Sequence, residues 1–156
     1  APPLTLKNLV VRGQVVVEGG EVNIERCLFE GSRAEMGGAL QVRSGSVKAT
    51  DTDFTNNTAW RGGAVHLEGG TAIFSSCRFM RNSAADTDGG GAFYILQGQV
   101  KLEEACSLVD NAAASKEESL WVSGDEATTV TYKLPAPLGF WVESFGQGTA
   151  ILGKGS

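Results

Sequence analysis

The stretch FTNNTAWRGGAV, residues 54–65, recurs along this chain of 156 residues and decides its fold. It places a phenylalanine three residues before an asparagine and follows the pair with Gly-Gly-Ala. Related stretches begin at Phe29, Phe79 and Leu108, and the three phenylalanines are 25 residues apart. A second marker has nearly the same period, with steps of 25, 25, 28 and 26 residues, and consists of Gly20, Gly45, Gly70, Gly98 and Gly124. Two independent markers with a shared period indicate a repeat protein.

Apolar and polar residues alternate within each repeat, as in VNIERCLF at 22–29 and AIFSSCRF at 72–79. Short alternating runs bounded by glycine are typical of β-strands. A unit of this length with two or three short strands suits one coil of a parallel β-helix, in which equivalent strands stack about 4.8 Å apart. The pattern therefore predicts an all-β solenoid of about five coils over residues 1–125. A closing strand and an irregular C-terminal cap are expected over residues 126–156, where Pro135 and Pro137 interrupt strand pairing.

Stacked coils place equivalent positions above one another, so the sequence predicts ladders of side chains. An apolar ladder consists of Phe29, Phe54, Phe79 and Leu108. A column of small side chains consists of Cys27, Thr52, Cys77 and Cys106. A turn column consists of Ser32, Asn57, Asn82 and Asn111. The cysteines are interpreted as small buried side chains, not as ligands or disulfide partners. The asparagines are expected to tolerate a left-handed backbone and to bond neighbours in the stack.

One further column is a candidate binding site. If the apolar residues of LQV, VHL, FYI and LWV point inward, the residues between them point outward, and these are Gln41, His66, Tyr94 and Trp121. A polar and aromatic strip on a flat sheet is typical of surfaces that dock carbohydrate or protein. The alternative is that these side chains cover strand edges or pack beneath the C-terminal segment.

Composition narrows the function classes. The formal net charge is −5 and no basic block occurs, so a nucleic-acid partner is not expected. No apolar run approaches the length of about 20 residues that spans a membrane, so no transmembrane segment is expected. No cofactor is predicted, and no catalytic residue is assigned.

The acidic pairs are weak candidates for chemistry. Lyases of the pectate type gather several carboxylates on Ca²⁺ beside a base, and glycoside hydrolases need two facing carboxylates. Asp51 and Asp53 have no acidic partners at the equivalent positions of adjacent coils. Asp86 and Asp88 resemble the start of a Ca²⁺ loop without its later ligands. An ice-binding face is not expected either, because one set of outward positions shows no threonine ladder: Asn23, Lys48, Ile73 and Lys101.

The segments Phe54–Asn57 with Gly62–Val65, and Phe79–Asn82 with Gly90–Phe93, resemble the repeats of chlamydial polymorphic membrane proteins and related pectin-lyase-like β-helix repeats. This resemblance implies a right-handed parallel β-helix and, for the bacterial family, surface adhesion. The stretch YKLPAPLGFWVESF at 132–145 resembles segments that follow such repeats in large extracellular proteins of algae and other protists. We therefore expect the cell exterior, the cell surface or an organelle lumen as the location.

Together these observations favour a non-catalytic structural or interaction module. It would bind a partner protein or a glycan through a lateral face of its β-sheet, alone or as a subunit of a larger assembly. The alternative is a polysaccharide-active lyase or hydrolase of the pectin-lyase-like class.

Overall fold

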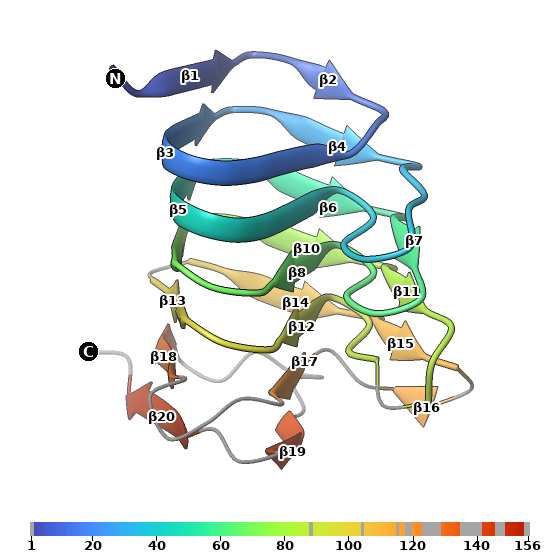
Figure 1. The fold of residues 1–156 in the computed structure, drawn as a ribbon. Coiled ribbons are helices and arrows are strands. Elements are labelled where there is room, and N and C mark those ends of the chain that lie inside the picture. Colours follow the sequence, from blue (N-terminus) through green and yellow to red (C-terminus); the bar gives the residue numbers. More distant parts are fainter. Residues whose placement is uncertain are drawn as a thin grey trace.

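The chain forms a parallel β-solenoid (Figure 1). The computed structural model describes residues 2–87, 89–103, 105–114, 116–117, 120–122, 129–134, 142–145 and 149–154. No helix occurs among these residues, and therefore none that is long and apolar enough to cross a membrane. The strands β1, β3, β5, β9 and β13 stack in order, so the chain makes about four turns between the first and the last of them. This agrees with the predicted all-β fold.

The described strands form three sheets. The 11-stranded sheet contains β1 (Leu4–Lys7), β3 (Val15–Glu25), β5 (Leu40–Thr50), β8 (Val65–Leu67), β9 (Thr71–Ser75), β12 (Phe93–Ile95), β13 (Gln99–Leu102), β17 (Leu120–Val122), β18 (Thr129–Leu134), β19 (Val142–Phe145) and β20 (Thr149–Lys154). The 5-stranded sheet contains β2 (Val10–Val11), β4 (Leu28–Glu30), β6 (Asp53–Thr55), β10 (Arg78–Met80) and β14 (Ser107–Val109). The 4-stranded sheet contains β7 (Thr58–Ala59), β11 (Ser83–Ala84), β15 (Ala112–Ala113) and β16 (Lys116–Glu117).

The largest sheet folds around one corner of the solenoid. The long strands β3 and β5 run through this corner, near Gly20 and Gly45, and thereby join two faces (Figure 1). We call one the β8 face, because the first parts of β3 and β5 pair there in line with β8, β12 and β17. We call the other the β9 face, because β1 and the second parts of β3 and β5 align there with β9 and β13.

Three other corners recur at residues with a positive φ angle, and one of them precedes the β8 face at Gly37, Gly62 and Gly90. Of the other two, the first follows the β9 face at Arg26, Asp51, Ser76 and Ala105, and the second follows the 5-stranded sheet at Gly31, Asn56, Arg81 and Asp110. The asparagines of the turn column were expected to take this left-handed conformation, but the residue before each of them does so instead. The reason is that the ladder asparagines turn inward and are buried, at 0% exposed for Asn57 and 1% for Asn82.

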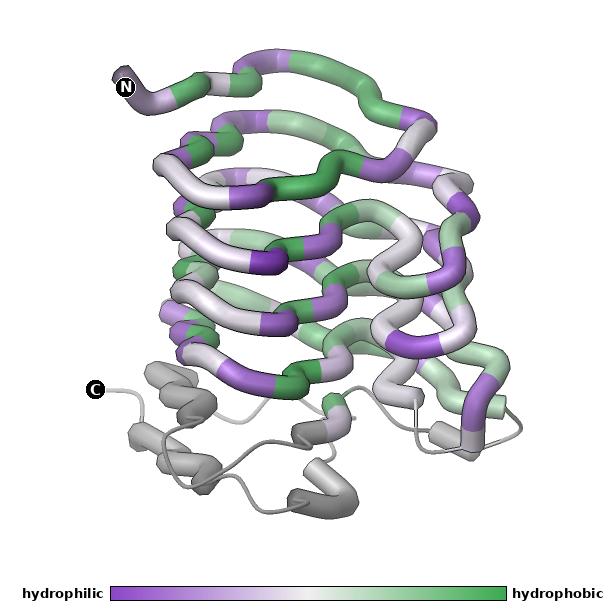
Figure 2. Tube along the Cα trace, in the orientation of Figure 1, coloured by the Kyte–Doolittle hydropathy of each residue, from purple (hydrophilic) through white to green (hydrophobic). Residues whose placement is uncertain are grey.

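Hydrophobic residues recur at corresponding places in successive coils (Figure 2), and their buried side chains form one core cluster. The Phe54 ring stacks on Phe29 at 5.0 Å between ring centroids and on Phe79 at 4.8 Å, and all three side chains are fully buried. Phe74 meets Phe54 edge-on from the β9 face, with a centroid distance of 5.9 Å. The three cysteines of the column of small side chains belong to the same core cluster and are buried free thiols. Leu108 follows Phe79 in register.

The predicted C-terminal cap contains β18, β19 and β20. Their backbones continue the largest sheet by parallel pairing, with β18 on β13, β20 on β18 and β19 on β17. Pro135 and Pro137 lie outside the described residues.

Candidate functional site

The four residues of the predicted binding column stack in register on the β8 face. Gln41 pairs with His66, His66 with Tyr94, and Tyr94 with Trp121. They alternate with core residues, so their side chains lie on the opposite side of the sheet from the core. The structure differs from the expected open strip, because Gln41, His66 and Tyr94 are only 7%, 3% and 6% exposed, whereas Trp121 is half-buried.

Close stacking and two charged residues bury this column. The His66 and Tyr94 rings are parallel within 1° at a centroid distance of 5.3 Å. The Arg61 guanidinium lies 5.2 Å from the centre of the Tyr94 ring, within the range of a cation–π contact. Gln41 Nε2 donates a hydrogen bond to Glu68 Oε1 at 2.9 Å. Little of the column is therefore available to a ligand.

Sequence reasoning missed Arg61 and Glu68, which complete this cluster. The Arg61 Nε donates to Asp86 Oδ2 at 2.8 Å, and this hydrogen bond raises the pKa of Arg61. Arg61 precedes Gly62-Gly63, and Glu68 follows β8, so both lie in the loops that flank the column. The signal in the sequence was their charge, because Arg61 and Glu68 lie on either side of the alternating run VHL at residues 65–67.

His66 is a neutral ring in this setting. Burial lowers the pKa of its imidazole, and the nearby Arg61 lowers it further, while Glu68 acts in the opposite direction. Its Nδ1 is buried without a hydrogen-bond partner among the described residues, and the nearest carboxylate oxygen, Glu68 Oε1, is 3.7 Å away. A neutral, covered imidazole suits packing better than ligand binding.

The described acidic candidates are either bound to an arginine or exposed at a corner. Asp86 is held by Arg61, and Asp88 lies outside the described residues. Asp53 accepts two hydrogen bonds from Arg78, at 3.0 and 2.7 Å, which raise the pKa of Arg78, whereas Asp51 is exposed at a corner. No group of three or more histidine, cysteine, aspartate or glutamate side chains is placed to hold a metal ion in the part of the chain that is described.

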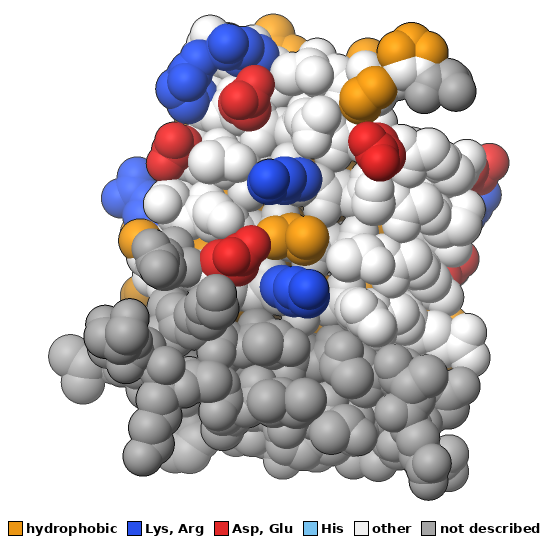
Figure 3. All heavy atoms as spheres, turned by 90° about the vertical axis from the view of Figure 1, so that its left-hand side faces the viewer, with side chains coloured by type: hydrophobic (Ala, Val, Ile, Leu, Met, Phe, Trp, Pro, Cys, Tyr) orange, Lys and Arg blue, Asp and Glu red, His pale blue; other side chains and the backbone are white. Residues whose placement is uncertain are grey.

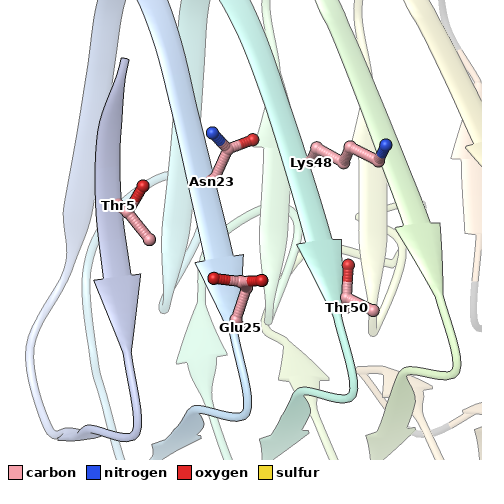
Figure 4. A pocket seen from close by; sticks show the side chains of 5 residues that line it. All are labelled: Thr5, Asn23, Glu25, Lys48 and Thr50. Carbon is pink, nitrogen blue, oxygen red and sulfur yellow. The ribbon is translucent and has the colours of Figure 1, made fainter. Parts of the chain in front are cut away.

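The β9 face carries a different candidate, which we call the polar hollow (Figure 4). This shallow recess is lined by outward side chains of β1, β3 and β5, namely Thr5, Asn23, Glu25, Lys48 and Thr50. Two rows cross the strands, because Thr5, Asn23 and Lys48 are in register, as are Glu25 and Thr50. Among the described residues, none of these five side chains forms a hydrogen bond or an ion pair.

Beyond the hollow, the same row continues down the β9 face. Lys48 is followed in register by Ile73 and then by Lys101. Figure 3 shows basic and hydrophobic side chains alternating along the middle of this face. Asn23 and Lys48 were recognised from the sequence as outward positions. The same alternation placed Glu25 and Thr50 beside them, two residues further on, but it gave no sign that the surface is hollowed there.

The comparison with protein families agrees with this architecture. Residues 51–68 match the Chlamydia polymorphic membrane protein (Chlamydia_PMP) repeat. The matched segment contains Phe54, Asn57, the Gly62-Gly63 corner and His66. Comparisons with curated proteins and with solved structures found no match. The short match and the parallel solenoid are consistent with a β-helix repeat protein similar to the polymorphic membrane proteins.

Proposed function

We propose that this chain is a non-catalytic interaction module that binds a glycan through the β9 face. The observation that carries the proposal is the polar hollow, where five outward side chains on three adjacent strands lack partners within the described protein. Lys48 offers only donors and Glu25 only acceptors, while Asn23, Thr5 and Thr50 offer both. Sugar hydroxyl groups also donate and accept, so they match this mixed lining.

The side chains that line the hollow favour a polar ligand over an apolar one. Binding sites for drug-like molecules are concave and largely apolar, whereas the side chains that line this recess are a lysine, a glutamate, an asparagine and two threonines. Equivalent side chains repeat about 4.8 Å apart across the sheet, which suits an extended ligand that lies along the stack. A partner protein that presents an extended polar segment is the alternative occupant.

The absence of catalysis is part of the proposal. Glu25 is the one carboxylate that lines the polar hollow, while Asp53 and Asp86 are bound by Arg78 and Arg61. Glycoside hydrolysis would require a second facing carboxylate, and β-elimination would require a Ca²⁺ cluster with a base. These considerations support binding over turnover, and the polysaccharide-active enzyme remains the competing proposal.

We place the protein at the cell exterior, the cell surface or an organelle lumen. The support is the repeat at residues 51–68, whose family is named for membrane proteins of Chlamydia. Extended glycans are abundant in these compartments, so the location and the proposed ligand agree.

A glycan array followed by titration calorimetry tests the proposal. Replacement of a charged or amide partner removes hydrogen bonds to the ligand, so Lys48→Ala and Asn23→Ala should each weaken binding roughly tenfold. Arg33→Ala is the matched control, because Arg33 is an exposed cation at an isolated bridge to Thr58, away from the β9 face. Equal weakening by all three variants would contradict the proposed face.

Two further outcomes would change the proposed function. If no glycan binds, affinity isolation from the source with mass spectrometry tests the partner protein, and a stoichiometric partner lost in Lys48→Ala would keep the face but change the occupant. Release of unsaturated or reducing ends from a polysaccharide would overturn the non-catalytic assignment and establish the enzyme instead.

A further inference from the structure

The three cysteines occupy one column but not equivalent surroundings. Arg78 and Ser107 pair in register, and the Ser107 amide donates to the Cys77 carbonyl at 3.0 Å, so Cys77 and Cys106 are direct neighbours in adjacent coils. Neighbouring strands lie about 4.8 Å apart, which falls within the Cα separation of about 4.4–6.8 Å found in disulfides.

Cys27 has no such neighbour. The next member of its column is Thr52, whose Oγ1 accepts a hydrogen bond from the Cys27 amide at 3.3 Å. Cys27 therefore lies two strand spacings, roughly 10 Å, from Cys77, which is beyond the reach of a disulfide without movement of the backbone. The column thus contains one adjacent pair of sulfurs and one isolated thiol.

The side chains of the adjacent pair make equivalent contacts. The Cys106 thiol donates to the Phe74 carbonyl at 3.2 Å, and Phe74 belongs to the coil that contains Cys77. The Cys77 thiol makes the equivalent bond one coil earlier, because it donates to the Ala49 carbonyl at 3.5 Å. Both sulfurs thus lie on the same side of the corner, in one buried row.

We propose that Cys77 and Cys106 are a modification site, at which a small-molecule disulfide such as oxidised glutathione converts them into a cross-coil disulfide while Cys27 stays reduced. The Cys106 thiolate attacks one sulfur of the oxidant, forming a mixed disulfide and releasing one reduced thiol. The Cys77 thiolate then attacks the Cys106 sulfur and releases the second. Two protein thiols are oxidised, one disulfide oxidant is reduced to two thiols, and both thiol protons pass to the departing thiolates.

The opposite pKa shifts of the two thiols assign the first nucleophile. The interaction with Cys77 lowers the pKa of Cys106, whereas the interaction with Cys106 and burial raise the pKa of Cys77. Because both side chains are buried, at 4% and 0% exposed, exchange takes place while these coils assemble or open. The closed bond then restrains the coil of β13 and β14 on the coil of β9 and β10.

Peptide mapping of the full chain refolded in oxidised glutathione tests the proposal directly. Cleavage after lysine and arginine separates the three cysteines into peptides 27–33, 62–78 and 102–116. Alkylation under denaturing conditions should label Cys27 alone, and peptides 62–78 and 102–116 should be recovered as one linked species, about 2 Da lighter than their sum. Three alkylated cysteines, or a link that includes Cys27, would overturn the proposal.

Stability measurements distinguish a disulfide between Cys77 and Cys106 from the packing of two free thiols. A reductant should lower the thermal midpoint of the oxidised wild-type chain by several degrees, and it should also do so in Cys27→Ser. Cys77→Ser and Cys106→Ser should show no response to reductant. The peptide map of the wild-type chain decides the question even where one of these variants does not fold, and a reductant response in Cys77→Ser would contradict the pairing.

Discussion

The side-chain oxygen of Asn82 accepts hydrogen bonds from both nitrogens of Asn57, from the backbone amide at 3.1 Å and from Nδ2 at 3.0 Å. Asn82 Nδ2 in turn donates to the Phe54 carbonyl at 3.0 Å and to Asn111 Oδ1 at 2.9 Å. One buried side chain thus joins three successive coils, because it bonds polar groups in the coil before its own and in the coil after it. This ladder holds the corner that follows the 5-stranded sheet.

Asn82→Ala should therefore be strongly destabilising. It leaves the Asn57 amide and the Phe54 carbonyl buried without their partner, at a cost of about 1–3 kcal/mol each. We expect the free energy of unfolding to fall by about 3 kcal/mol in urea titrations followed by circular dichroism.

Ser32→Ala is the matched control at the end of the same column. Ser32 Oγ donates one hydrogen bond, to the Gly13 carbonyl at 3.2 Å, while the Ser32 amide keeps its bond to Asn57 Oδ1. Its loss should cost about 1 kcal/mol. Equal costs at Ser32 and Asn82 would show that the ladder is not cooperative across coils.

Phe54 should be the most sensitive member of the aromatic ladder. It is fully buried and stacks between Phe29 and Phe79. Phe54→Ala would leave a large cavity and should lower the free energy of unfolding by about 4 kcal/mol. Phe54→Leu should cost only about 1 kcal/mol, because leucine already occupies the equivalent position at Leu108.

Trp60→Ala serves as the comparison for the loss of an aromatic ring. Trp60 is 49% exposed and lies outside the core, so its removal should change the free energy of unfolding by about 0.5 kcal/mol. A larger cost at Trp60 than at Phe54 would contradict the assignment of the core ladder.

The fold was predictable because a solenoid repeats its local rules in every coil. The period of Phe29, Phe54 and Phe79 predicted their stacking, and strict alternation separated inward from outward residues. The left-handed residues of the second recurrent corner were harder to assign, since Arg81 and Asp110 carry no glycine or asparagine signal at that position. Their conformation is imposed by the buried ladder residue that follows.

The candidate site was only partly predictable, for a related reason. Alternation established that Gln41, His66 and Tyr94 lie on the side of the sheet away from the core, but it says nothing about what covers that side. Their burial depends on Arg61 and Glu68, which reach the column from loops. The polar hollow likewise depends on how neighbouring strands place short and long side chains side by side.

The glycine corners should tolerate substitution unequally. Gly62 has a φ of +65°, and a Cβ atom there would clash with the Val65 carbonyl oxygen. Gly20 has a φ of +75°, but a Cβ atom there would meet no other atom within 4 Å. Gly62→Ala should therefore cost at least about 3 kcal/mol in thermal or urea unfolding, because the corner must shift.

Gly20→Ala isolates the cost of the backbone conformation alone. It should destabilise the chain by about 1–2 kcal/mol, the usual cost of a left-handed residue with a side chain. If the two variants were equally stable, steric contact at the Gly62 corner would not be limiting.

His66 predicts a dependence of stability on pH. Burial lowers its pKa below the ordinary value of 6.5, so the unfolded chain binds a proton more readily than the folded one. Stability should thus be unaffected by this group well above pH 6.5 and should fall as the pH drops below that value, until the folded imidazole is protonated as well. His66→Gln, which copies Gln41 of the neighbouring coil, removes this contribution.

Urea unfolding of the wild type and of His66→Gln, compared from about pH 7.5 to about pH 5, checks the sign. The stability of the wild type relative to the variant should decrease on acidification, and because the chain has a single histidine, no other imidazole contributes to the difference. Carboxylates titrate in both proteins and cancel to first order. A relative gain in wild-type stability at low pH would show that attraction between the imidazolium and Glu68, 3.7 Å away, outweighs burial and the repulsion by Arg61.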